Sequence, residues 1–208
     1  MDLHLWYTFV VASAVLLIIP GPTIILVLTY ALTQGRKVAV ASAAGVATGD
    51  LIAMTASLAG LGALVLASAT LFTVIKWIGV LYLIWMGIGM IRAAGSLRVP
   101  STQAPVLPAG RIFKNAAMVT ALNPKSIVFF IAFVPQFIAP ESPLIPQFAV
   151  LIATFVGLAF INAMAFALLA DRLRGTVRRP AVLAWMTRLG GSVLVAMGVA
   201  TATLRRAA

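Results

Sequence analysis

The chain has 208 residues, of which 62% are hydrophobic and only 9% charged, with a formal net charge of +11. The apolar runs leave no polar stretch long enough for a separate soluble domain, so we expect one membrane domain over residues 1–208, in contact with the lipid bilayer. The basic residues lie in short segments beside apolar runs, where they anchor membrane topology, and this excludes nucleic acid as a partner. With no cysteine in the chain, disulfides, thiolate metal sites and cysteine nucleophiles are excluded as well.

Six apolar segments are each long enough to cross a hydrocarbon core of about 30 Å, which takes about 20 helical residues. A backbone in lipid must satisfy its own hydrogen bonds, so these segments are expected to be helices of an all-α integral membrane protein. The N-terminus lacks the basic region of a signal peptide, so we expect the first segment to be retained as a span. The predicted spans are Leu5–Leu32, Val38–Val65, Thr70–Ile91, Ile112–Ala139, Pro146–Ala170 and Ala181–Leu204.

The first span contains Pro20, Gly21 and Pro22 well inside its apolar run. Two prolines remove amide donors there, so the helix is expected to break. Glycine is accepted as an N-cap and proline is favoured at the first helical position, which predicts a new half-helix starting at Pro22. Its free N–H groups would face the membrane midplane and attract an anion such as an amino-acid carboxylate. The alternative is a simple proline kink, which is common in transmembrane helices.

The second span contains Asp50, one of only four acidic residues in the chain. Asp50 lies twelve residues past Val38, or about 18 Å along a helix, which places it near the midplane. An ionised group at that depth costs at least about 2.5–3.5 kcal/mol, so such residues usually mark transport pathways. Asp50 is therefore our first candidate for binding a substrate or a coupling proton.

A proline-rich stretch over about 95–110 is the longest predicted linker, and it separates a first half of about 1–94 from a second half of about 111–208. Basic residues gather in this linker and in the first and last loops, near Arg36 and Arg172, but not in the other two loops. This distribution predicts a cytoplasmic linker and external termini. The basic pair at 205–206 would then lie on the external side, against the rule that basic residues stay in the cytoplasm.

The fourth span repeats the first break, because Asn123 and Pro124 resemble another N-cap followed by a first helical residue. Lys125 comes next and lies thirteen residues past Ile112, so it should share the depth of Asp50 and pair with it. Pairing would lower the cost of keeping either charge in the membrane. The alternative is an ion pair that only fixes helix register.

The two halves share spacings between polar residues. Asp50 and Lys76 are 26 residues apart, as are Asn162 and Arg188. Three spans in each half would insert the second half upside down, so the fold is predicted as six transmembrane helices in two inverted three-helix repeats, an architecture of many secondary transporters. Asn162 matches Asp50 in this scheme and is either a site residue or a helix–helix contact.

Four motifs, taken together and in order, resemble the LysE/RhtB family of amino-acid exporters over nearly the whole chain. They are Pro20-Gly-Pro22, Gly45-x-x-x-Gly49-Asp50, Lys76-x-x-Gly79-x-x-Tyr82-Leu83-x-x-x-Gly87, and Asn123-Pro124-Lys125 followed by Pro135-Gln136-Phe137. The resemblance implies a multi-pass protein of the bacterial cytoplasmic membrane. It also implies outward transport of amino acids such as threonine, homoserine, leucine, lysine or arginine, driven by the proton gradient.

Joined to this resemblance, the residues suggest that the half-helix N-termini and Lys125 hold a substrate carboxylate while Asp50 receives the ammonium or a proton. An intramembrane enzyme is the first rival, but the chain has a single histidine near its end and no second midplane carboxylate for an acid pair or a metal site. A scaffold or channel subunit is the second rival, and it gives Asp50 no role. We expect no metal and no cofactor. The identity of the amino acid and the oligomeric state, a homo-oligomer included, stay open.

Overall fold

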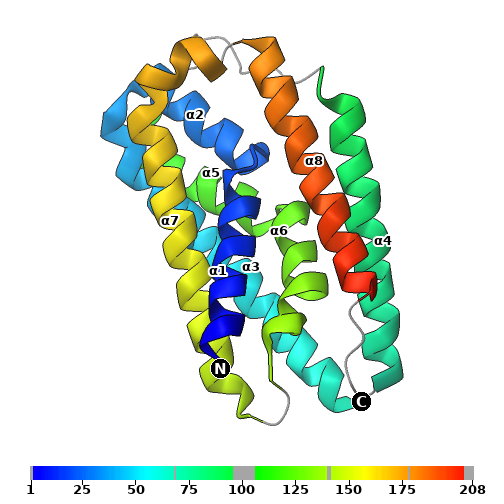
Figure 1. Ribbon diagram of the computed structural model, residues 1–208. Coiled ribbons are helices and arrows are strands. Elements are labelled where there is room, and N and C mark those ends of the chain that lie inside the picture. Colours follow the sequence, from blue (N-terminus) through cyan, green and yellow to red (C-terminus); the bar gives the residue numbers. More distant parts are fainter. Residues whose placement is uncertain (1, 68, 96–105, 140–141, 178, 204–208) are drawn as a thin grey trace.

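The computed structural model describes residues 2–67, 69–95, 106–139, 142–177 and 179–203 (Figure 1). Within these residues every regular element is a helix, as predicted for an all-α membrane protein. The first half contains α1 (Leu3–Ile18), α2 (Pro22–Gln34), η1 (Arg36–Val38), α3 (Ala39–Ala67) and α4 (Ala69–Ala93). The second half contains α5 (Ala109–Ala121), α6 (Pro124–Val128), η2 (Phe129–Phe133), η3 (Val134–Phe137), α7 (Leu144–Val177) and α8 (Pro180–Thr203).

Four of these helices, α3, α4, α7 and α8, are long and apolar enough to cross a membrane unbroken. The pair α1 and α2 is bent by 56°, and α5 is bent by 43° against the segment Pro124–Phe137. With each bent pair counted as one span, the described residues give up to six spans, which agrees with the predicted number. The chain therefore has the apolar helices of a multi-pass membrane protein, with two bent helix pairs, one in each half.

The predicted limits of the spans need two corrections. The helix α7 runs on to Val177, so Arg172 and Arg174, which were predicted in a loop, lie in its last turns. Charged side chains form helices as readily as apolar ones, so hydropathy marks where a span leaves the lipid and not where its helix ends. Most of the predicted linker lies outside the described residues, and Ala109 and Gly110 at its end already belong to α5.

The helices form a bundle of α1, α3, α5, α6 and α7, with α4 and α8 paired along one side (Figure 1). Glycines allow the closest crossings. A Cβ atom on Gly87 of α4 would lie 2.5 Å from the carbonyl oxygen of Gly191 on α8. Likewise, a Cβ atom on Gly49 of α3 would lie 2.5 Å from the carbonyl oxygen of Ala117 on α5. The second crossing holds Asp50, the next residue of α3, beside the break between α5 and α6.

Below that break the interior is filled by aromatic rings. Phe129 and Phe130 of the π-helical turn η2 are fully buried, and the ring of Phe130 meets that of Phe155 on α7 edge to face at 4.8 Å between centroids. Such pairs add about 0.5–1.5 kcal/mol beyond the burial of their area. This packing fixes the second interrupted span against α7 and so fixes the position of the site above it.

Candidate functional site

The first break lies between Ile18 and Pro22. The new helix α2 begins at Pro22 with Gly21 as its N-cap, as predicted, and no side chain caps it. A helix that ends inside a protein leaves carbonyl groups of its last turn without partners within the helix. The carbonyls at the end of α1 therefore need donors from elsewhere in the molecule.

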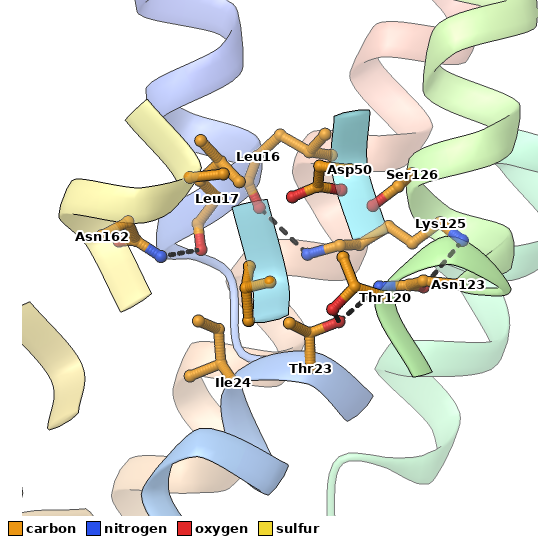
Figure 2. A pocket seen from close by; sticks show the side chains of 12 residues that line it. Leu16, Leu17, Thr23, Ile24, Asp50, Thr120, Asn123, Lys125, Ser126 and Asn162 are labelled. Carbon is orange, nitrogen blue, oxygen red and sulfur yellow. Dashed lines mark hydrogen bonds between the residues drawn. The ribbon is translucent and has the colours of Figure 1, made fainter. Parts of the chain in front are cut away.

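Lys125 supplies two of these donors from the other half of the chain. Its side chain is only 8% exposed, and Nζ donates to the carbonyl oxygens of Leu16 and Ile19, each at 3.1 Å. Figure 2 shows the bond to Leu16. A cation at this place also faces the negative end of the α1 dipole. A Cβ atom on Gly21 would lie 3.6 Å from Nζ, so the ammonium sits directly against the first break.

Asn162 satisfies a third carbonyl of the same turn. Its side chain, on α7, donates from Nδ2 to the carbonyl oxygen of Leu17 at 3.0 Å (Figure 2). Asn162 also lines the small cavity that Asp50 and Lys125 share. Asn162 therefore joins two helices and also borders the cavity, and its role as a site residue stays a prediction.

The second break is capped by its own residue. Helix α6 begins at Pro124, and the Asn123 side chain accepts a hydrogen bond from the Lys125 backbone N–H at 3.1 Å, as expected of an N-cap. The Asn123 Nδ2 group donates to Thr23 Oγ1, in the first turn of α2, at 3.1 Å. This asparagine therefore links the two breaks.

Asp50 lies beside this junction and is 2% exposed. It shares with Lys125 a cavity of about 20 Å³ between the two breaks. Within the part of the chain that the structure describes, Asp50 Oδ1 has no hydrogen-bond partner. Figure 2 shows the carboxylate above the Lys125 side chain, next to Ser126.

The predicted ion pair between Asp50 and Lys125 needs a correction. The two residues meet at one cavity and their opposite charges attract each other, but no close ion pair joins these two described side chains. Two of the three N–H groups of the Lys125 ammonium donate to carbonyls of α1 instead. The positions of Asp50 and Lys125 in the sequence predicted that the two side chains lie at the same depth. They did not reveal that the broken end of α1 offers the ammonium competing acceptors.

Three hydroxyl side chains of the cavity were missed at the sequence level. Thr23, Thr120 and Ser126 are all buried there, and Thr120 and Thr23 approach to 3.4 Å between their oxygens. Each lies within three residues of a break, at Pro22 or Asn123. Proximity in sequence to a break inside a span was the signal that could have found them.

The site combines a carboxylate, an ammonium, two amides and three hydroxyls, all of which suit a small zwitterion. Its volume of about 20 Å³ is close to the about 10–15 Å³ that one water molecule needs, so this conformation is closed around the polar groups. Among the described residues, no three His, Cys, Asp or Glu side chains gather as metal ligands would. The arrangement is suited to binding and release of such a molecule.

Comparison with known proteins gives a family match over most of the chain. The family model described as "LysE type translocator" matches residues 14–205. The chain is 35% identical over 207 residues to the homoserine/homoserine lactone efflux protein of Salmonella typhimurium, a match that covers 100% of both chains. It is 33% identical over 133 residues to the leucine efflux protein of Klebsiella pneumoniae, covering 64% of this chain and 63% of that relative. No solved structure matches.

Proposed function

Because the chain belongs to the LysE family of translocators, we propose that it exports an amino acid or a close derivative across the bacterial cytoplasmic membrane. The family membership confirms the resemblance found in the sequence. It also confirms that the chain is a transporter and not an enzyme. The two relatives are named for homoserine, its lactone and leucine, none of which has a charged side chain, and this favours a neutral substrate.

The observation that carries the proposal is the buried carboxylate of Asp50, with one oxygen unpartnered among the described residues, at a cavity shared with a buried ammonium. A polar group buried without a hydrogen bond costs about 1–3 kcal/mol. A substrate ammonium or a proton at Asp50 removes that cost. The substrate carboxylate takes the Lys125 ammonium, together with the uncapped N–H groups at the start of α2.

Transport follows from exchange of these partners. In the closed conformation the Lys125 ammonium is held by two backbone carbonyls of α1. A substrate carboxylate competes for that ammonium, and its arrival frees the end of α1 to move. We propose that the halves are inverted repeats whose breaks act as hinges, so that the cavity opens alternately to the two sides of the membrane.

Coupling to the proton gradient belongs to the same proposal. Asp50 releases its proton to bind the substrate ammonium and takes a proton back for the return step. The proposal assumes the orientation that the basic residues predict, with both termini external and the linker between α4 and α5 cytoplasmic.

Efflux of labelled amino acids from preloaded cells tests the proposal in an Asp50→Asn variant. The substitution keeps the shape of the side chain and removes its charge, so efflux should fall to background at matched membrane levels of protein. The control is Asp2→Asn, the same exchange at an exposed aspartate, where efflux should stay at the wild-type rate. Efflux by the Asp50→Asn variant at the wild-type rate would rule out the proposed role of this carboxylate.

A further inference from the structure

A second cavity, of about 360 Å³, lies beyond Lys125 from Asp50. Its walls come from both breaks, at Pro20–Pro22 and Asn123–Lys125, and from one face of α4. We propose that this cavity receives the side chain of the transported amino acid and selects neutral aliphatic substrates. This proposal rests on the proposed export function and specifies its substrate class.

The two cavities meet at the same residues. Asn123 and Lys125 line both, so the buried ammonium stands at their junction. A zwitterion whose carboxylate binds the Lys125 ammonium can direct its Cα substituent toward α4. The amino-acid head and its side chain then each have a compartment of matching polarity.

The walls of the second cavity are suited to an aliphatic group. Ile25 of α2 and the α4 residues Met86, Met90 and Ala93 supply apolar surface. Methionine side chains are unbranched and adapt to different shapes, so they can accept both straight and branched chains.

The same walls disfavour a charged side chain. The polar side chains of the lining are Asn123, Lys125 and Thr187, and none of them is acidic. A substrate with a basic side chain would lose its hydration there without a counter-charge and would meet the Lys125 ammonium. Lysine and arginine are therefore expected to be poor substrates.

The volume also fits this use. Pockets that hold small organic ligands measure about 300–1,000 Å³, and this cavity falls at the lower end of that range. The cavity reaches the surface of the chain, since Trp85 in its wall is 68% exposed. A lipid acyl chain or a second copy of the protein is a competing occupant. An acyl chain that enters the cavity leaves its charged head group at the membrane surface and brings no carboxylate to the buried Lys125 ammonium, whereas an amino acid brings its carboxylate and its side chain together.

Gly89 provides the test. It lines the cavity from α4, and a Cβ atom added there meets nothing within 4 Å. A larger side chain at this position can therefore fill the cavity without clashing with neighbouring residues. Gly157 of α7 is the matched control, because a Cβ atom there also meets nothing within 4 Å and it is remote from this cavity. The variants are Gly89→Leu and Gly157→Leu, with Met90→Ala as a third variant that enlarges the cavity.

The assay is uptake of labelled homoserine or leucine, whichever the wild type exports, into everted membrane vesicles. Unlabelled alanine, norvaline, norleucine and lysine serve as competitors. In the wild type, inhibition should strengthen by up to about fourfold for each added methylene, and lysine should inhibit weakly. Gly89→Leu should flatten or reverse the dependence of inhibition on chain length. Met90→Ala should extend the dependence to longer chains, and the control Gly157→Leu should leave it unchanged.

The opposite results overturn the assignment. A wild-type dependence on chain length in both Gly89→Leu and Met90→Ala contradicts it, as does inhibition by lysine equal to that by norleucine. If the competitor series is unchanged in Gly89→Leu but the content of bound lipid changes, the cavity binds a lipid chain. If the oligomeric state changes instead, the cavity is an interface with a second copy of the protein. Wild-type vesicles that take up no amino acid would overturn the proposed function itself, which is a different outcome.

Discussion

The two helix breaks are alike in sequence but satisfy their backbones differently. At the second break, the N–H groups of Leu122 and Asn123 still bond back into α5, and the Asn123 side chain caps α6. At the first break, no side chain caps α2, and the carbonyls at the end of α1 accept hydrogen bonds from Lys125 and Asn162 in the other half. The second break satisfies its backbone groups with its own residues, whereas the backbone of the first takes its donors from the opposite half.

This difference indicates which break can respond to a substrate. Separation of the two halves would take the donors away from the first break and leave the cap of the second intact. A substrate that competes for Lys125 therefore acts on the first break directly. We expect substitutions to reflect this asymmetry, with the largest effects where the first break loses its donors.

The largest effect is expected for Lys125→Met. The variant loses the cation that binds the substrate carboxylate. It also leaves the carbonyls of Leu16 and Ile19 without donors, and each buried carbonyl without a hydrogen bond destabilises the folded protein by about 1–3 kcal/mol. Efflux should fall to background, and the purified protein should unfold at a lower temperature in detergent. Lys37→Met, at an exposed lysine of η1, is the control and should behave as the wild type. Unchanged thermal stability of Lys125→Met would show that the first break does not depend on these contacts.

A smaller and matched pair of effects is expected for Pro22→Ala and Pro124→Ala. Each substitution restores a backbone donor and favours a continuous helix through the break, which withdraws the free N–H groups from the site. Efflux should weaken in both variants. Because alanine forms helices better than proline, stability in detergent should hold or rise, so that lost transport is distinguishable from lost folding. Full transport by either variant would remove the corresponding break from the mechanism.

The smallest effect is expected for Asn123→Ala, because the second break keeps its backbone hydrogen bonds. Loss of the N-cap should cost about 0.5–2 kcal/mol of stability and reduce efflux only in part. Asn123→Ser retains a good N-cap and should recover most of the stability, although it loses the link from Nδ2 to Thr23. Thermal unfolding and efflux of the two variants, measured side by side, separate the cap from the link. A loss in Asn123→Ala larger than in Lys125→Met would reverse the comparison of the two breaks.

The sequence predicted an all-helical membrane protein and the positions of both breaks, because apolar length and proline chemistry are local properties. It also predicted that Asp50 and Lys125 share a depth. It could not predict the partner of the Lys125 ammonium, since that choice depends on which carbonyls of α1 the other half approaches. The large cavity was also beyond prediction, because its apolar wall comes from the placement of α4 against both breaks.

The hydroxyl residues of the site show a related limit. Thr23 and Ser126 are ordinary residues in a membrane helix, where a hydroxyl often bonds to the carbonyl of the preceding turn. Only the meeting of the two breaks places them beside Asp50. Local pattern therefore identified the charged and amide residues of the candidate site, and tertiary structure identified the hydroxyl residues.

We propose above that an amino acid binds between the two breaks, with its carboxylate at Lys125 and its ammonium at Asp50. The most direct measurement is the rise in Tm of the purified protein on adding the exported amino acid, because a ligand at about 100 times its Kd stabilises the folded state by about 2.7 kcal/mol. We expect Tm to rise clearly for the wild type, Asp2→Asn and Lys37→Met, and to stay unchanged for Asp50→Asn and Lys125→Met. Equal stabilisation of all five proteins would contradict the proposal.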